Sequence, residues 1–262
     1  MTERIIERKL AELSELRSGW RPPVGDAAWL RRAWAAWSNA GIEGNPLSWP
    51  RARVLLARNE TAAGGRVTRE LHGCLEALEF IDALPADLEI WTPSLPRQLH
   101  AILMRGLGRD PGALRAGEVK IVRESGRMAG ETVFAPPHPG RVPELLEELL
   151  AETRRELRAG CDVFLLSGRF HYEFQSIHPF EDGNGRAGRL LSTLIARRGW
   201  SSAGFHLAPA VARAGAGYYL ALRAVRADYE SSARDGLNPW LLPYFDMLED
   251  ALRNPDPDKE PS

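Results

Sequence analysis

The chain of 262 residues is poor in several features that would assign a protein to a class at once. It has only two cysteines, Cys74 and Cys161, without CxxC or zinc-finger spacing, so reduced buried thiols are expected rather than a disulfide scaffold. No apolar run approaches the roughly 20 residues that a membrane-spanning helix needs. Residues 1–20 are charged throughout and lack an apolar core, which argues against a signal peptide.

The chain also lacks an excess of charge of either sign. Its formal net charge is −1, so no global field favours nucleic acid or a membrane surface as a partner. The apolar fraction of 44% and the charged fraction of 26% are ordinary for a globular protein, and the length suits one large domain or two small ones. These features predict a soluble, cytoplasmic protein.

Apolar residues recur at helical spacing along most of the chain. Asp26 is placed to cap the second helix, which Gly44 and Pro46 end. The period changes only around residues 118–134, where two short β-prone pieces flank a glycine-bearing tip, as in a hairpin. The pattern predicts a mainly α fold with one small hairpin. Its helices are expected at residues 4–18, 26–45, 51–83 (broken at Gly64-Gly65), 94–107, from Pro143 through Leu150, 163–177, 187–198, 217–229 and 238–253.

Residues 178–189, His-Pro-Phe-Glu-Asp-Gly-Asn-Gly-Arg-Ala-Gly-Arg, form the most reactive stretch of the sequence. Pro179 disfavours α geometry at His178, so the buried helix before it should end there. A new helix follows the glycines at once, and its first turn has unpaired N–H groups and a dipole that favours negative charge. Glycine lets a ligand approach this backbone closely. The stretch therefore predicts an anion site suited to phosphate.

The side chains of this stretch extend the same chemistry. Arg186 and Arg189 lie three residues apart on the new helix, so their guanidinium groups can serve several phosphates in a row. Asp182 offers a hard oxygen ligand for Mg²⁺, which binds proteins through one or two carboxylates plus substrate phosphates. His178, with a reference pKa near 6.5, suits a general base. Phe180 should anchor the loop in the core, whereas Glu181 is expected to be solvated and without a role.

Other readings of the stretch fail on context. Gly183 to Gly188 match G-x-G-x-x-G, but the dinucleotide motif needs a preceding strand and an acid about 20 residues later, and both are missing. The Gly-Lys-Ser/Thr ending of a P-loop is absent. The pair His171 and His178 has i, i+7 spacing rather than the i, i+4 spacing of a helical zinc pair.

The stretch from His178 to Arg189 resembles the complete signature of Fic-domain proteins, and the similarity extends over about residues 95–250. The resemblance implies the Fic fold, a helical bundle with a small hairpin flap. It also implies transfer of AMP from ATP, with Mg²⁺, to a Ser, Thr or Tyr hydroxyl of a target protein. The chain itself is one candidate target, and a homodimer is one of the assemblies left open. No nucleic acid or membrane partner is expected.

Each residue of the signature takes a role by this resemblance. His178 would remove the proton of the target hydroxyl, and Asp182 would hold Mg²⁺. The α- and β-phosphates would be bound by Gly183, Asn184, Gly185 and Arg186, and the γ-phosphate by Arg189. The flap would pair with the target backbone as an added strand through Glu131, Thr132, Val133 and Phe134.

The stretch from Asn39 to Asn45 resembles the family's inhibitory motif, Ser/Thr-x-x-x-Glu-Gly/Asn. Glu43 would then pair with Arg189 and block the γ-phosphate. Asn39 departs from the usual Ser or Thr, and Ser38 comes one place too early. The resemblance suggests an N-terminal helical region at 1–93 with the inhibitory helix at about 26–45, a catalytic domain at 94–250 and a disordered tail at 251–262.

Three functions remain open at this level. The first is a self-inhibited protein adenylyltransferase. The second is removal of AMP from a modified protein, with Glu43 positioning a water. The third is a binding module without activity, against which the intact signature argues.

Overall fold

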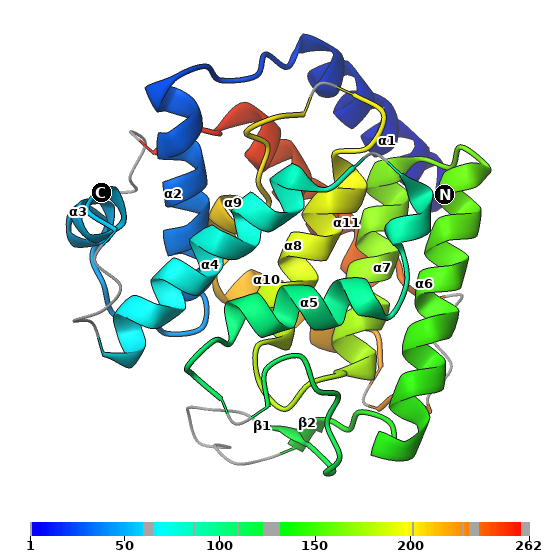
Figure 1. Cartoon of the computed structure of the whole chain (residues 1–262). Helices are drawn as coiled ribbons and strands as arrows, with labels where there is room; N and C mark the ends of the chain where they lie inside the picture. Colours follow the sequence, from blue (N-terminus) through cyan, green and yellow to red (C-terminus); the bar gives the residue numbers. More distant parts are fainter. Residues whose placement is uncertain are drawn as a thin grey trace.

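A computed structural model of the chain describes residues 2–59, 65–85, 87–108, 110–122, 132–200, 202–226, 228–230 and 236–257. This part is mainly helical with one small two-stranded sheet, which confirms the expected fold class (Figure 1). The α-helices are α1 (Thr2–Gly19), α2 (Asp26–Gly41), α3 (Trp49–Ala57), α4 (Arg66–Ala83), α5 (Ser94–Leu103), α6 (Val142–Arg158), α7 (Val163–Ile177), α8 (Asn184–Ala196), α9 (Ala208–Ala214), α10 (Ala216–Arg223) and α11 (Asn238–Arg253). The strands are β1 (Ile121–Val122) and β2 (Thr132–Phe134), and 3₁₀ turns lie at η1 (Leu88–Ile90) and η2 (Pro139–Arg141).

The consecutive helices α7 and α8 lie at the centre of the molecule, with other helices around them (Figure 1). α7 begins at residue 163 because the Asp162 carboxylate accepts hydrogen bonds from the N–H groups of Phe164 and Leu165. Its large apolar side chains, including Phe170 and Phe174, are buried, and α8 packs closely against it. The short loop between the two helices therefore emerges directly from the core.

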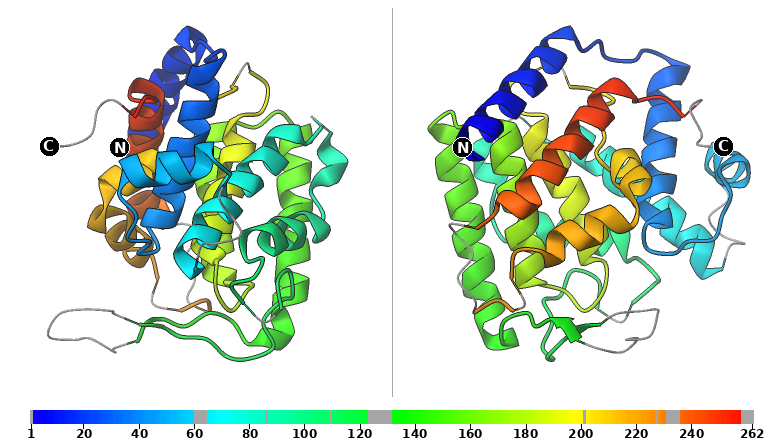
Figure 2. Two further views of the ribbon diagram at one scale, coloured as in Figure 1. Left: turned by 60° about the vertical axis from the view of Figure 1, so that its left-hand side comes forward. Right: turned by 180° about the vertical axis from the view of Figure 1, so that it is seen from behind.

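The helices α2 and α4 pack against one side of α8, and α3 lies outside them against α2 and α4 (Figure 1). Trp34 on α2 packs against Trp37 and Trp49, with ring centroids 4.7 and 4.9 Å apart, so these tryptophans belong to the core. α1 lies along α11 behind the core, where Lys9 forms ion pairs with Asp246 and Glu249 (Figure 2). The packing of α2 on α4 and α8 holds the end of α2 next to the start of α8.

Some helix ends differ from the sequence prediction. α2 begins after Gly25 without a side-chain cap, so Asp26 is its first residue and not its cap. It ends at Gly41, which leaves Glu43 in the turn that follows the helix. The helix predicted for residues 94–107 stops at Leu103, because the chain turns back at Met104 and passes through Gly106 with a positive φ of 71°.

The C-terminal part contains a helix that the periodicity did not predict, α9, which Gly215 separates from α10 at a φ of 52°. α10 ends at Arg223 instead of Tyr229, because residues 228–229 pair with Ala135 at the end of the hairpin. Residues 251–253 complete α11, and Asp256 accepts a hydrogen bond from Arg31, so the predicted disordered tail is wrong as far as residue 257. Residues 258–262 lie outside the described part. No described helix has the length and apolarity to cross a bilayer.

Candidate active site

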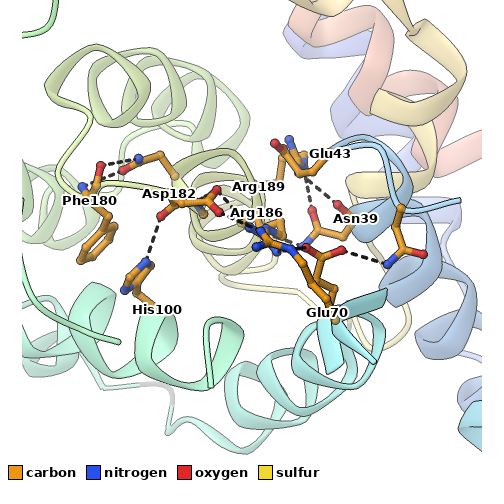
Figure 3. A network of polar contacts seen from close by, with 12 residues as sticks. Asn39, Glu43, Glu70, His100, Phe180, Asp182, Arg186 and Arg189 are labelled. Carbon is orange, nitrogen blue, oxygen red and sulfur yellow. Dashed lines mark hydrogen bonds and ion pairs between the residues drawn. The ribbon is translucent and has the colours of Figure 1, made fainter. Parts of the chain in front are cut away.

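The loop between α7 and α8 is held in one shape by its own side chains (Figure 3). Asn184 closes it, since its Oδ1 accepts the N–H of Phe180 at 2.9 Å and its Nδ2 donates to the Phe180 carbonyl at 2.8 Å. Phe180 is fully buried, as predicted, and stacks on His100 with ring centroids 3.8 Å apart. Gly183 has a φ of 78°, and a Cβ at this position would press against Met104. The loop amides are thus presented by a rigid backbone.

Two buried residues without a predicted role, His100 and Arg115, support this loop from outside. The N–H of Gly112 donates to His100 Nδ1 at 2.9 Å, which leaves the proton on Nε2 to be donated to the Asp182 carbonyl at 3.0 Å. Burial lowers the pKa of His100, consistent with a neutral ring. Arg115 donates to the His178 carbonyl at 2.7 Å and also to that of Ile177. In the sequence, His100 stands out only as a polar residue on the apolar face of α5, which does not reveal its role in supporting the loop.

His178 ends α7 in a left-handed conformation, with a φ of 51°. Its Nδ1 lies 3.4 Å from the Gln175 carbonyl, which assigns the proton to Nδ1 and leaves the lone pair on Nε2. Burial lowers the pKa of His178 to about 4. The ring is therefore neutral at pH 7 and able to accept a proton.

Arg186 and Asp182 face each other across the first turn of α8. Arg186 Nη2 donates to Asp182 Oδ1 at 3.2 Å, and the Arg186 side chain is only 2% exposed. The Asp182 side chain is 52% exposed, and its Oδ1 also accepts the N–H of Gly183 at 2.6 Å. The buried Nε of Arg186 has no hydrogen-bond partner. One side of this turn therefore offers an open carboxylate beside a cation with an unused donor.

Arg189 points the other way, toward the end of α2 (Figure 3). Its Nη2 forms an ion pair with Glu43 Oε1 at 2.6 Å, and its Nε donates to Asn39 Oδ1 at the same distance. Asn39 also accepts from Nη2 through its own carbonyl and donates to the carbonyl of Arg186 at 3.4 Å. Ser38 Oγ is buried without a partner, so it does not replace the expected hydroxyl. Asn39 is the residue that holds Arg189.

The space around Arg189 is shaped for an anion. The Arg189 side chain is 1% exposed, and its Nη1 is buried without a partner. A Cβ at Gly185 would collide with Glu43 Oε1, so the glutamate carboxylate sits directly against the loop backbone. The first-turn N–H groups of α8, the unused Arg186 Nε and the unused Arg189 Nη1 together fit several phosphate groups.

The donor set also fits Mg²⁺ held together with phosphates. In the parts of the chain that the structure describes, no cluster of three or more His, Cys, Asp or Glu side chains could hold a metal alone. Asp182 offers one half-exposed carboxylate next to the anion site. An ion bound through a single carboxylate and substrate phosphate oxygens is the usual arrangement for Mg²⁺.

The hairpin closes the site on the side opposite α2. Thr132 pairs with Val122, and Phe134 pairs with Ile121 across an irregular antiparallel ladder. A cavity of about 350 Å³ extends between the hairpin, α7, α8 and α10. Its lining comes from the hairpin, from α7, α8 and α10, and from the turn after α2. It includes Val133, Phe134, Gln175, His178, Gly185, Arg189, Glu43, Tyr218 and Arg223. The structure thus places His178, Glu43 and part of the flap around one cavity, whereas Glu131 lies outside the described residues.

Comparison with known proteins gives a consistent family. Residues 91–196 match the model of the Fic/DOC family. A protein of Drosophila willistoni named protein adenylyltransferase Fic is 29% identical over 211 residues, which is 76% of this chain and 40% of that protein. The protein of the same name from Drosophila grimshawi is 30% identical over 76% of this chain and 41% of that protein. The chain therefore spans about two fifths of the length of these curated relatives.

Solved structures agree on the fold. A Fic family protein from Desulfovibrio desulfuricans has a TM-score of 0.78 at 25% identity, over 95% of this chain and 73% of that one. Fic-1 of C. elegans has a TM-score of 0.74 at 22% identity, over 97% of this chain and 72% of the other, and so supports the fold alone.

Proposed function

We propose that this protein, which carries a Fic/DOC domain, is a protein adenylyltransferase that moves AMP from ATP to a hydroxyl group of a target protein. One observation carries the proposal. A neutral His178 shares a cavity with the anion site at the start of α8. A base next to a multi-phosphate site is what attack of a hydroxyl on a phosphate requires. The names of the curated relatives support the same reaction.

In the proposed reaction the target hydroxyl loses its proton to Nε2 of His178 as its oxygen attacks the α-phosphorus of ATP. The bond from the α-phosphorus to the bridging oxygen of the β-phosphate breaks, and pyrophosphate leaves. The amides of Gly183 to Gly185 and the Arg186 guanidinium hold the α- and β-phosphates. The rigid loop contributes by positioning and by charge already in place. Mg²⁺ at Asp182 would neutralise phosphate charge.

The same geometry supports self-inhibition. Glu43 occupies Arg189, the cation proposed for the γ-phosphate, and lies against the Gly185 backbone. A γ-phosphate would meet the Glu43 carboxylate there, so ATP can take the productive position only when Glu43 has moved. Residues 1–93 would then be the regulatory part of the chain and residues 94–250 the catalytic part.

The flap residues are proposed to select the target. Thr132 is exposed on β2, a strand of an open two-stranded sheet, and Val133 and Phe134 line the cavity that contains His178. An extended target segment could add its backbone to this edge and bring a Ser, Thr or Tyr hydroxyl to the histidine. Glu131 belongs to the same proposal by its place in the sequence.

The test is incubation with Mg²⁺ and ATP labelled on either the α- or the γ-phosphorus. We expect α-label on protein, more of it with Glu43→Gly, and none with His178→Ala in that background. Label from the γ-position alone would make the protein a kinase. Failure of Glu43→Gly to transfer α-label to any protein of a lysate or to itself would contradict the proposal.

A further inference from the structure

A second cavity lies away from the catalytic loop. It has a volume of about 700 Å³, twice that of the cavity at His178. Its walls come from the first half of α2, the end of α4, the end of α8 and the segment after it. In Figure 1 this is the opposite end of α8 from the loop that precedes Asn184. None of the proposed catalytic residues lines it.

The cavity carries more positive than negative charge. Arg32 of α2 and Arg197 at the end of α8 both pair with one carboxylate, Asp82 of α4. Arg197 uses its other nitrogens on the Phe205 carbonyl and on His206 Nδ1. Two guanidinium groups thus share one partly exposed carboxylate at the wall of the recess.

Unused hydrogen-bond donors face this recess. Arg32 donates to Asp82 through Nε at 2.8 Å, and among the described residues its terminal nitrogens have no protein acceptor. A guanidinium group can only donate, so the bond from Arg197 makes His206 Nδ1 an acceptor and places the ring proton on Nε2. Burial and the nearby arginines, Arg197 foremost, hold the pKa of His206 well below its ordinary value. Arg32 and His206 therefore offer donors and no acceptor.

The remaining walls are apolar. Ile81, Trp91 and Leu194 line the recess beside Trp200, whose ring is fixed by a hydrogen bond from Nε1 to the Ala196 carbonyl at 2.7 Å. An ion network that served the fold alone would account for Asp82, Arg197 and His206. It would not account for the volume of the cavity or for the terminal nitrogens of Arg32, which have no acceptor among the described residues. Volumes of this size with apolar walls and a few convergent polar groups are typical of small-molecule sites.

We propose that this cavity binds a small organic anion, a phosphate monoester with a flat apolar body. The phosphate would accept from the Arg32 fork and from His206 Nε2, and the body would lie on the tryptophan side. A dianionic headgroup suits a recess in which two guanidinium groups share one carboxylate.

The position of the cavity connects it to the catalytic site. Arg32 lies on the helix that leads to Glu43, and Arg197 follows the helix that carries Arg189. Eight residues of helix separate Arg189 from Arg197, about 12 Å at 1.5 Å per residue. The cavity exists only while α2 is docked on α4 and α8, which is also the arrangement that brings Glu43 to Arg189. A ligand in the cavity therefore stabilises the docked state and opposes ATP. This coupling rests on the proposed function, but binding of the anion does not.

Binding is tested by calorimetric titration of the full chain with phenyl phosphate, compared with phenol and inorganic phosphate. We expect one saturable site for phenyl phosphate that Ala28→Phe removes by filling the recess. Arg32→Gln should weaken it about tenfold to a hundredfold. Arg51→Gln, an exposed arginine on α3, is the matched control and should have no effect. Absence of binding to the wild type, binding unchanged in Ala28→Phe, or equal binding of phenol would overturn the site.

The coupling is tested by titrating ATP with and without saturating phenyl phosphate. The probe should weaken ATP binding about fivefold or more in the wild type. It should have no effect on ATP binding in Ala28→Phe, which lacks the site, or in Glu43→Gly, in which docked α2 no longer blocks Arg189. The same weakening in all three proteins would mean direct competition in the phosphate site and would contradict the coupling. Because no measurement here uses AMP transfer, failure of the proposed function would appear separately in the α-label assay.

Discussion

The first turn of α8 has two sides that are built differently. On the loop side, Arg186 faces Asp182, four residues away, and Asn184 closes on Phe180 at the same separation. On the α2 side, Arg189 depends on Asn39 and Glu43, about 150 residues away. The loop side needs its own residues together with His100 and Arg115 of the catalytic part, whereas the α2 side exists only when the N-terminal helices are docked. Arg189 thus depends on α2, whereas Arg186 is held by Asp182 of the loop and by Glu70 of α4.

From this difference we expect the loop side to serve the proposed reaction and the α2 side to serve its regulation. Changes on the loop side should lower AMP transfer, because they remove groups that we propose act on ATP or the target. Changes on the α2 side should alter its regulation or the stability of the docked helices and leave the loop intact. The following predictions sharpen or break this division, from the largest expected effect to the smallest.

His178→Ala, made in the Glu43→Gly background, should reduce α-label transfer by about 10²- to 10⁴-fold, the usual contribution of a general base. ATP affinity, measured by calorimetry, should change little, because the ring is not proposed to hold phosphate. A comparable loss of ATP binding would mean that the substitution had disrupted the loop and would remove the argument for a base.

The pH dependence of transfer should follow the lowered pKa of His178, which burial brings to about 4. A base acts in its unprotonated form, so Glu43→Gly should keep most of its activity down to about pH 5. A histidine at its ordinary pKa of about 6.5 would lose about thirtyfold by that pH. Rates should be measured together with thermal melts, because a lowered histidine pKa also costs stability as pH falls below 6.5. An inflection near pH 6.5 in the still folded protein would show that the base is solvated.

Asn39→Ala should lower the free energy of unfolding by about 1–2 kcal/mol, since it leaves the buried Nε of Arg189 without an acceptor. Ser38→Ala is the matched control from the adjacent residue. Its buried hydroxyl has no partner, so its removal should cost much less. Denaturant melts of both variants make the comparison, and equal losses would show that Asn39 contributes packing alone.

Tyr219→Phe should produce the smallest effect. The Tyr219 hydroxyl donates to the Ile42 carbonyl at 3.1 Å and so tethers the turn that carries Glu43 to α10. Loss of this exposed bond, about 0.5–1 kcal/mol, should raise basal transfer two- to fivefold. Leu220→Ala changes the neighbouring, more exposed side chain and should leave the rate unchanged. If both variants behave alike, the tether has no role in inhibition.

The same division explains which features could be read from the sequence. The end of α7 just before Pro179 and the buried Phe180 follow from local rules, and the structure has both. The pairing of Glu43 with Arg189 came from resemblance to the Fic family, since nothing in the periodicity of α2 points to a residue so far along the chain. The structure has this ion pair, while its inhibitory role stays a prediction.

What the sequence could not provide depends on tertiary contacts. His100 and Arg115 support the loop through backbone carbonyls, and no spacing rule reveals which carbonyl a buried side chain will meet. The role of Asn39 as the holder of Arg189 required the observation that Ser38 is without a partner. The short α9 and the early end of α10 likewise reflect a positive φ at Gly215 and pairing with Ala135, not helical propensity.

The central claim is that Glu43 controls access of ATP to Arg189. The most direct test is the affinity for ATP with Mg²⁺, measured by calorimetry for the wild type, Glu43→Gly and the double variant Glu43→Gly/Arg189→Gln. Removal of a carboxylate 2.6 Å from the guanidinium should strengthen ATP binding at least about tenfold, and the double variant should lose that gain. Equal affinities of the wild type and Glu43→Gly, or a gain that survives the loss of Arg189, would contradict the account.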